Sequence, residues 1–193
     1  MIWTKPLRYL RYRHLEKFVI ELLVPSCVAT LFLAFSMAFP NHFLTWVDVV
    51  AVQVNSLLSI LAGLFVAGLG LIATLDTPML RGALGGTSPE IWNSQYGEYV
   101  KPSRREFYSL QFGYLVIATI VAFGIGITII VLSSEFCASC DPPIPAQGGS
   151  TPDLWFLVVA ASTAYSWLLT HILSITAIGV GFLATKLPEG SHD

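Results

Sequence analysis

The sequence predicts an all-α integral membrane protein with four transmembrane helices in two antiparallel hairpins, and with both the N- and C-termini in the cytoplasm. Of its 193 residues, 54% are hydrophobic and only 11% are charged, whereas about 25% of the residues in an average soluble domain are charged. Four apolar segments each reach the roughly 20 residues that a bilayer-spanning helix needs. All 10 Lys and Arg residues lie on the same side of these segments, and basic residues that flank spans are retained in the cytoplasm.

The N-terminal part of the chain predicts a membrane-surface helix followed by a span. Residues 1–17 mix basic, apolar and aromatic side chains, which is typical of a basic interfacial helix. The alternative is an ordinary basic anchoring flank without a recognition role. Residues 18–39 form an apolar run of full membrane length, so we expect them to remain as the first span rather than to be cleaved as a signal peptide.

The second span, residues 47–75, follows after a short connection, so we expect it to form a tight antiparallel hairpin with the first. A cytosolic loop, residues 76–106, comes next. Within it, Trp92, Tyr96 and Tyr99 recur at spacings of four and three, which would align them on one side of a short helix. Such a helix could lie on the membrane or contact a partner.

The third span is expected over residues 107–133. Ser103 precedes it and Glu106 follows three residues later, a spacing that predicts a capping box. A periplasmic loop over residues 134–153 leads to the fourth span, residues 154–185, and then to a cytosolic tail, residues 186–193. Both later spans exceed the length that a bilayer requires, so we expect tilting or protrusion into the cytoplasm.

A stripe of small or hydrogen-bonding side chains runs along the second span with a period of four residues. Such stripes let helices approach closely in lipid, so this one is a candidate oligomer interface, and packing within the monomer is the alternative. Its members are Ala51, Asn55, Ser59, Gly63 and Ala67.

Two ionisable residues within the spans are candidates for a role at membrane depth. Glu21 lies near the start of the first span, and its carboxylate could face a vestibule or a partner or simply snorkel beside Lys17. His171 lies in the middle of the fourth span. It could respond to protons or be a neutral structural histidine.

Cys137 and Cys140 form the only paired-cysteine motif, in the predicted periplasmic loop. An oxidising compartment favours a disulfide between them, while metal binding and free thiols are the alternatives. A lone pair lacks the second ligand pair of a structural zinc site. No phosphate-binding loop, zinc-protease motif or supported nucleophile is apparent in the sequence, so we predict no enzymatic activity, no catalytic residues, no metal and no cofactor.

Three stretches of the chain carry a resemblance to a known family. They read SLLSILAG from Ser56 to Gly63, DTPMLR from Asp76 to Arg81 and RREFYSLQFGY from Arg104 to Tyr114. In these, and in its four-span layout, the chain resembles membrane subunits of the Kiwa anti-phage system, the KwaA family. The resemblance implies a homo-oligomer of the bacterial inner membrane that detects envelope disturbance and works with a cytosolic effector subunit.

The leading hypothesis is therefore a non-enzymatic sensor and scaffold of an antiviral defence system. We expect a homo-oligomer, with a tetramer as one arrangement, together with anionic lipids and the cytosolic subunit as partners, and no direct contact with nucleic acid. The residues predicted to bind the cytosolic partner are Arg81, Trp92, Tyr96, Tyr99, Arg104 and Arg105. A small oligomeric ion channel or pore-forming membrane effector is the alternative, because several residues place polar groups within the spans. They are Asn55, Ser56, Ser59, Ser162, Thr163, Ser166 and Thr170.

Overall fold

A computed structural model describes residues 9, 19–75, 78–82, 91–93, 98–138 and 152–186 of the chain. It confirms an all-α architecture with four helices that are long and apolar enough to cross a membrane. The candidate spans are Val19–Ala38, Trp46–Thr74, Arg104–Ser134 and Trp155–Gly181.

The helices extend beyond the expected spans in three of the four cases. The first span is a π-helical turn, η2 (Val19–Leu23), continued by α2 (Val24–Ala38). The other three are α3 (Pro40–Thr74), α5 (Arg104–Ala138) and α6 (Pro152–Lys186). A short helix, α4 (Pro78–Arg81), follows α3.

Proline and serine explain where two of these helices begin. Proline is tolerated in the first turn of a helix because its missing N–H would have no partner there, and α3 accordingly begins at Pro40, directly after Phe39. The residues expected to form a loop between the first two spans are therefore already helical. At the start of α5, Ser103 Oγ accepts a hydrogen bond from the Glu106 backbone N–H at 3.2 Å, which confirms the predicted cap.

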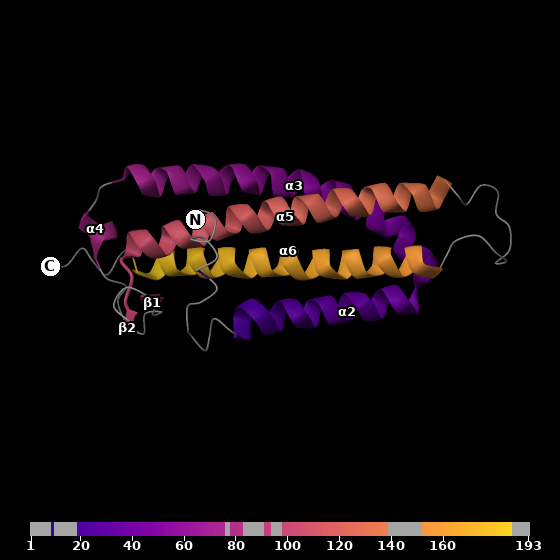
Figure 1. Ribbon diagram of the computed structural model, residues 1–193, viewed down its shortest axis with the longest axis horizontal. Helices are drawn as coiled ribbons and strands as arrows, with labels where there is room; N and C mark the ends of the chain where they lie inside the picture. Colours follow the sequence, from indigo (N-terminus) through magenta and orange to yellow (C-terminus); the bar gives the residue numbers. More distant parts are fainter. Residues whose placement is uncertain are drawn as a thin grey trace.

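The four long helices lie side by side in the order α3, α5, α6, α2 (Figure 1). This order differs from the expected tight pairing of the first two spans, because α2 packs along α6 while α3 packs along α5. α3 and α2 each bury one face of the helix against the bundle. α3 presents Ala51, Leu58 and Phe65 to the core, whereas α2 buries Pro25, Ala29 and Ser36.

The predicted helix around Trp92 is wrong. The structure has two short antiparallel strands, β1 (Ile91–Asn93) and β2 (Glu98–Val100), with Trp92 paired directly opposite Tyr99. Both strands are rich in the aromatic and β-branched residues that favour strands, and Gly97 between them is a poor helix former. Tyr96 lies outside the described residues.

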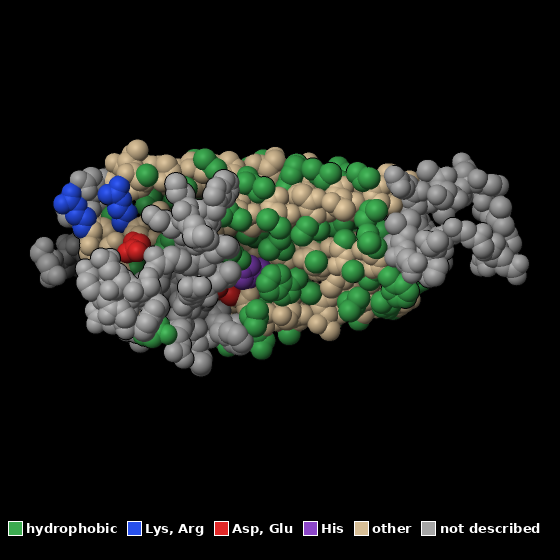
Figure 2. Space-filling view, in the orientation of Figure 1, with side chains coloured by type: hydrophobic (Ala, Val, Ile, Leu, Met, Phe, Trp, Pro, Cys, Tyr) green, Lys and Arg blue, Asp and Glu red, His purple; other side chains and the backbone are tan. Residues whose placement is uncertain are grey.

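The described basic side chains gather at one end of the bundle, beside the last turn of α3 and the first turn of α5 (Figure 2). Apolar side chains are spread over the rest of the visible face, between the grey segments (Figure 2). We call this the basic end, and it contains Arg81, Lys101, Arg104 and Arg105. The opposite end, where α3 and α6 begin, is the far end.

Candidate functional site

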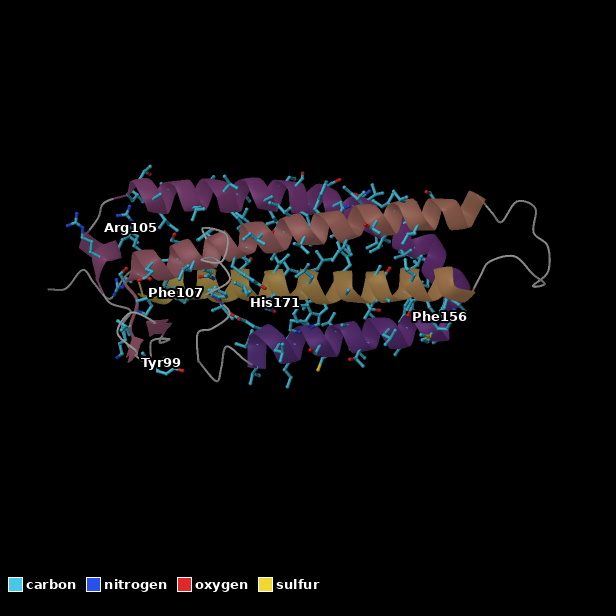
Figure 3. All side chains as sticks on the ribbon, in the orientation of Figure 1. Tyr99, Arg105, Phe107, Phe156 and His171 are labelled. Carbon is cyan, nitrogen blue, oxygen red and sulfur yellow. The ribbon has the colours of Figure 1, made fainter. Side chains whose placement is uncertain are left out.

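Four polar side chains from four separate parts of the chain meet inside the bundle. They are Tyr9, Glu21 of η2, Tyr114 of α5 and His171 of α6, and we call them the Glu21–His171 cluster. Glu21 is only 5% exposed and His171 only 3%. Figure 3 shows His171 well inside the length of the bundle rather than at either end.

Direct hydrogen bonds join the members of this cluster. The Tyr9 hydroxyl donates to Glu21 Oε1 at 2.7 Å. His171 Nδ1 lies 2.7 Å from the backbone carbonyl oxygen of Glu21, and His171 Nε2 lies 2.8 Å from the Tyr114 hydroxyl. The contacts therefore connect the start of the first span to the third and fourth spans.

The chemistry of these groups determines the tautomer of the imidazole. A carbonyl oxygen can only accept, so Nδ1 of His171 carries a hydrogen and donates it to Glu21. In the neutral ring, Nε2 is then the acceptor for the Tyr114 hydroxyl. Protonation of Nε2 would reverse that second bond and turn Tyr114 from donor into acceptor, so the cluster can accommodate both charge states of the ring without moving a heavy atom.

Pro25 explains why the carbonyl oxygen of Glu21 is available to His171. In an α-helix this oxygen would accept a hydrogen bond from the N–H of the residue four positions later. That residue is Pro25, which has no N–H and whose ring crowds the carbonyl. The chain widens there into the π-helical turn η2, and such turns are frequent at functional sites.

Aromatic rings enclose the cluster. Tyr9 stacks on Tyr114 with ring centroids 5.5 Å apart, and Trp167 stacks on His171 with centroids 5.0 Å apart and an interplanar angle of 15°. The Trp167 indole N–H also donates to Ser26 Oγ at 3.3 Å. Trp167 therefore covers one face of the His171 ring.

The cluster lies far from both ends of the longest helices. α6 continues from His171 to Lys186, which corresponds to about 22 Å of helix at roughly 1.5 Å per residue. Glu21 and His171 both belong to candidate membrane spans, where ionisable side chains are costly and mark functional sites more often than other positions. Glu21 is buried and bonded to Tyr9. Lys17, beside which the alternative interpretation placed its carboxyl group, lies outside the described residues.

The small-residue stripe of α3 divides into two parts. Ala51 and Asn55 are buried within the monomer, and Asn55 Oδ1 accepts a hydrogen bond from the Tyr165 hydroxyl at 2.8 Å. Gly126 of α5 leaves the room that the Asn55 amide occupies. Ser59, Gly63 and Ala67 are exposed, so only this half of the stripe is accessible to a second copy.

The predicted partner-binding residues have different environments. Arg81 and Tyr99 are exposed, Tyr99 by 45%. Arg104 and Arg105 are half-buried, and the Arg105 guanidinium donates to the Ala73 carbonyl oxygen in the last turn of α3. Figure 3 shows Arg105 and Tyr99 on different elements near the same end of the bundle. Only the backbone of Trp92 is described.

The polar residues considered as pore-lining do not share one surface of the monomer. Asn55 and Ser162 are buried in the bundle, whereas Ser56 and Ser59 lie on the exposed side of α3. The hydroxyls of Ser56, Ser59, Thr163 and Thr170 bond to carbonyl oxygens of their own helices.

The described side chains form neither a disulfide nor a metal site. Cys140 lies outside the described residues, as does the side chain of Cys137, and Cys27 is an exposed free thiol on α2. Among the described residues, no three His, Cys, Asp or Glu side chains gather closely enough to hold a metal ion.

The chain matches no protein-family model, no curated protein and no solved structure. Sequence patterns had singled out Glu21 and His171 separately, but they missed Tyr9, Tyr114 and Trp167. The one available signal was Pro25, four residues after Glu21 in an apolar helix.

Proposed function

We propose that this chain is a non-enzymatic inner-membrane sensor and scaffold, in which the Glu21–His171 cluster couples the first span to the rest of the bundle and the basic end binds a cytosolic effector. The observation that carries this proposal is the buried carboxyl group of Glu21. Glu21 Oε1 accepts a hydrogen bond from Tyr9, while the backbone carbonyl oxygen of the same residue bonds to His171 in the interior of the apolar bundle.

The packing of α2 supports a sensing role. α2 lies at one edge of the row and packs chiefly against a single long helix, α6. Among the described residues, Glu21 of the preceding turn η2 bonds to His171 of α6, and Ser26 of α2 bonds to Trp167 of α6. A helix held at an edge by a few bonds can occupy two positions whose energies the surrounding membrane biases.

The basic end supports a scaffolding role. Arg81 and Lys101 are exposed there beside the hairpin that carries Tyr99. Exposed basic and aromatic residues suit an acidic protein surface, and the same charges suit anionic lipid headgroups. A bacterial defence system with a soluble effector subunit is the setting that the sequence resemblance implies, and the proposal includes it. We also include self-assembly through the exposed half of the α3 stripe.

Distance measurements between spin labels test the sensing half of the proposal. Cys27, Cys137 and Cys140 are replaced by Ala, and labels are placed at the exposed positions Leu31 of α2 and Leu64 of α3. The protein is reconstituted in thin and in thick phosphatidylcholine bilayers. We expect the proportions of two distances to change between bilayers, and His171→Phe to shift the proportions in every bilayer. A single distance that is the same in all bilayers would contradict the proposal.

Binding of a soluble protein encoded beside this chain tests the scaffolding half. We expect it to sediment with proteoliposomes of the wild-type chain and to be lost with Arg81→Glu/Lys101→Glu, a change at two exposed positions. The unfolding temperature of this double variant is compared with that of the wild type. Arg105→Glu is a poor choice because that side chain also caps α3. Equal sedimentation of wild type and double variant would remove the basic end from the proposal. Ion flux through the same vesicles would favour the channel alternative.

A further inference from the structure

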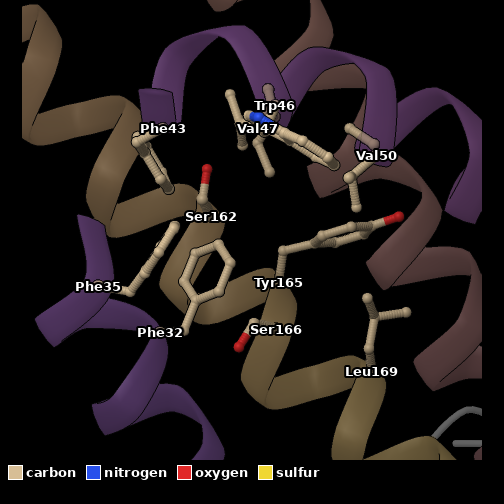
Figure 4. Close-up of a pocket in the computed structure, with 12 residues that line it drawn as sticks. Phe32, Phe35, Phe43, Trp46, Val47, Val50, Ser162, Tyr165, Ser166 and Leu169 are labelled. Carbon is tan, nitrogen blue, oxygen red and sulfur yellow. The ribbon is translucent and has the colours of Figure 1, made fainter. Parts of the chain in front are cut away.

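A pocket with charged side chains in its wall lies at the basic end, where the last turns of α3 meet the first turns of α5. Its volume is about 320 Å³, whereas the aromatic pocket toward the far end measures about 120 Å³ and has no charged residue in its lining (Figure 4). We call it the charged pocket. It is lined by Ile72, Ala73, Ser103, Arg105, Glu106 and Ser109. A cationic and an anionic side chain therefore border one space of the size that small ligands occupy.

The two charged side chains of this pocket do not bond to each other. Among the described residues, the Arg105 guanidinium makes one hydrogen bond, to the Ala73 carbonyl oxygen, and keeps four further N–H donors. The Glu106 carboxylate has no hydrogen bond or ion pair in the same part of the chain. Adjacent residues of a helix point about 100° apart, so the two charges border the pocket from different directions. A ligand with one anionic and one cationic group complements them.

The hydroxyls around Arg105 identify the anionic group. Ser103 Oγ accepts a hydrogen bond from the Glu106 backbone N–H, and neither its own hydrogen nor that of Ser109 has an acceptor among the described residues. An Arg fork with hydroxyl donors beside it suits phosphate oxygens. A carboxylate such as that of Glu106 accepts hydrogen bonds from an ammonium group. The pocket therefore fits a phosphate that carries a primary ammonium close by.

The charged pocket lies at a membrane boundary. The candidate span of α3 ends at Thr74 and that of α5 begins at Arg104, so Ala73 and Arg105 lie within one residue of these limits. Polar headgroups border the hydrocarbon core at this level. A phospholipid can thus place its headgroup in the pocket while its acyl chains stay in the apolar layer.

A second pocket lies deeper along the same two helices. It has a volume of about 250 Å³, and we call it the inner pocket. Its lining consists of Leu58, Ser59, Ala62, Thr119, Ile120 and Phe123. The helix from Ser109 of the charged pocket to Thr119 of the inner pocket rises about 15 Å, at roughly 1.5 Å per residue. That is about half of the roughly 30 Å hydrocarbon core, which is the depth that an acyl chain of one leaflet covers.

Residues seven positions apart lead from one pocket to the other along the seam between α3 and α5, which lie side by side (Figure 1). Seven residues are nearly two helical turns, so such residues share one face of a helix. All of them are exposed or half-buried, and Val66 is 55% exposed. They are Ala73, Val66 and Ser59 on α3, and Ser109, Val116 and Phe123 on α5. An accessible strip therefore connects the two pockets.

We propose that this seam binds one molecule of phosphatidylethanolamine. Its phosphate bonds to Arg105, its ammonium group bonds to Glu106, and one acyl chain follows the strip into the inner pocket. This lipid has no net charge, so the site differs from the general attraction of anionic lipids to the basic end. The inference does not depend on the sensor proposal.

Three lipids with the same dioleoyl chains test the headgroup preference. The full chain is freed of lipid in detergent and titrated with phosphatidylethanolamine, phosphatidylcholine or phosphatidylglycerol, and native mass spectrometry quantifies the first bound lipid. We expect phosphatidylethanolamine to bind tightest, by about two- to fivefold, the range of an exposed ion pair. Phosphatidylcholine has no N–H to donate to Glu106, and phosphatidylglycerol has no cationic group.

Variants of Glu106 separate recognition from folding. The Glu106 side chain is exposed, and its backbone N–H keeps the bond to Ser103 in any variant. We expect Glu106→Gln to abolish the preference for phosphatidylethanolamine over phosphatidylglycerol, and Glu106→Lys to reverse it. Lys101→Gln is the control, because Lys101 is exposed but does not line the pocket, and it should keep the wild-type preference.

The variant Ala62→Phe fills the inner pocket and tests where the acyl chain lies. We expect it to weaken binding of all three dioleoyl lipids by the same factor. Dihexanoyl phosphatidylethanolamine, whose chains are too short to reach Ala62, should bind to the wild type and to this variant alike. Unchanged binding of the dioleoyl lipids would show that no chain follows the strip.

Three further results would overturn the proposal. Equal binding of the three lipids by the wild type would mean that the charged pocket does not distinguish headgroups. A preference retained in Glu106→Gln would mean that the carboxylate takes no part. Oxidation of Val66→Cys in membranes, with Cys27, Cys137 and Cys140 replaced by Ala, tests a second copy as the occupant. A disulfide-linked dimer would show that another chain covers the strip instead of a lipid.

Discussion

His171 Nδ1 lies 2.7 Å from the backbone carbonyl oxygen of Glu21, although 150 positions separate the two residues in the chain. The contact joins the first span to the last one and uses an oxygen to which Pro25, which lacks an N–H, cannot donate. This hydrogen bond is the centre of the polar cluster. Its effects on stability and on the resonances of the His171 ring can be measured on the isolated chain.

The coupling between His171 and Tyr114 should be visible in thermodynamic stability. Tyr114→Phe removes the hydroxyl that bonds to His171 Nε2, and His171→Phe leaves that hydroxyl unpaired. We expect each change to lower the free energy of unfolding by about 1–2 kcal/mol. The double variant should lose less than the sum, by about 0.6–1.7 kcal/mol. Unfolding in mixed micelles gives the four values, and strict additivity would show that the two side chains do not interact.

Pro25→Ala tests why the Glu21 carbonyl oxygen is available. The new alanine supplies the missing N–H, so we expect the π-helical turn to revert towards an α-helix and the bond from His171 Nδ1 to weaken. The nitrogen and proton resonances of that ring should move towards those of an imidazole with a weaker hydrogen bond. Val28→Ala, on the exposed side of the same helix, is the control, and resonances unchanged in Pro25→Ala would contradict this explanation.

Two glycines on α5 make a matched pair for the packing of α3. A methyl group at Gly126 would collide with the Asn55 amide, whereas at Gly124 it would meet nothing within 4 Å. We expect Gly126→Ala to lower the free energy of unfolding by about 1–3 kcal/mol, and Gly124→Ala to leave it unchanged or raise it by up to about 1 kcal/mol. Equal effects at the two positions would mean that the α3–α5 contact is not as close as the structure has it.

Arg105 is expected to stabilise the bundle as well as any partner contact. Its guanidinium bonds to the Ala73 carbonyl oxygen at the end of α3, where a positive charge also complements the helix dipole. Arg105→Gln should therefore cost about 0.5–1.5 kcal/mol of unfolding free energy. Lys101→Gln, at an exposed position nearby, should cost almost nothing. Chemical unfolding of the two variants under the same conditions makes the comparison.

The four spans could be predicted from the sequence because their number depends on apolar length alone. The run expected over residues 154–185 is α6 over Pro152–Lys186, and the other long helices agree to a similar degree except at the start of α3. The order of the helices could not be predicted. Apolar side chains cover most sides of each span, and the order depends on individual fits such as Asn55 against Gly126, which periodicity does not reveal.

The sequence indicated two members of the candidate site but not the residues that surround them. Glu21 and His171 stood out because charged and titratable residues are rare in spans, but nothing in their spacing indicated that they touch. The tyrosines could not be assigned, because aromatic residues near span ends are common. The spacing of Trp92 and Tyr99 suggested a helix, yet the paired strands place the same two residues opposite each other. Two residues seven positions apart, such as Trp92 and Tyr99, can share one side of a helix or face each other across a hairpin.

The pairing of α2 with α6 also bears on how the chain is made. A ribosome completes the first span long before the last, and domains form progressively from the N-terminus. The helix that carries Glu21 must therefore wait in the bilayer for its binding partner to be synthesised. A chain that terminates before Pro152 would lack His171 and would leave the Glu21 backbone carbonyl oxygen without this hydrogen bond. Completion of the fourth helix thus distinguishes a finished molecule from a truncated one, which membrane proteases could recognise and remove.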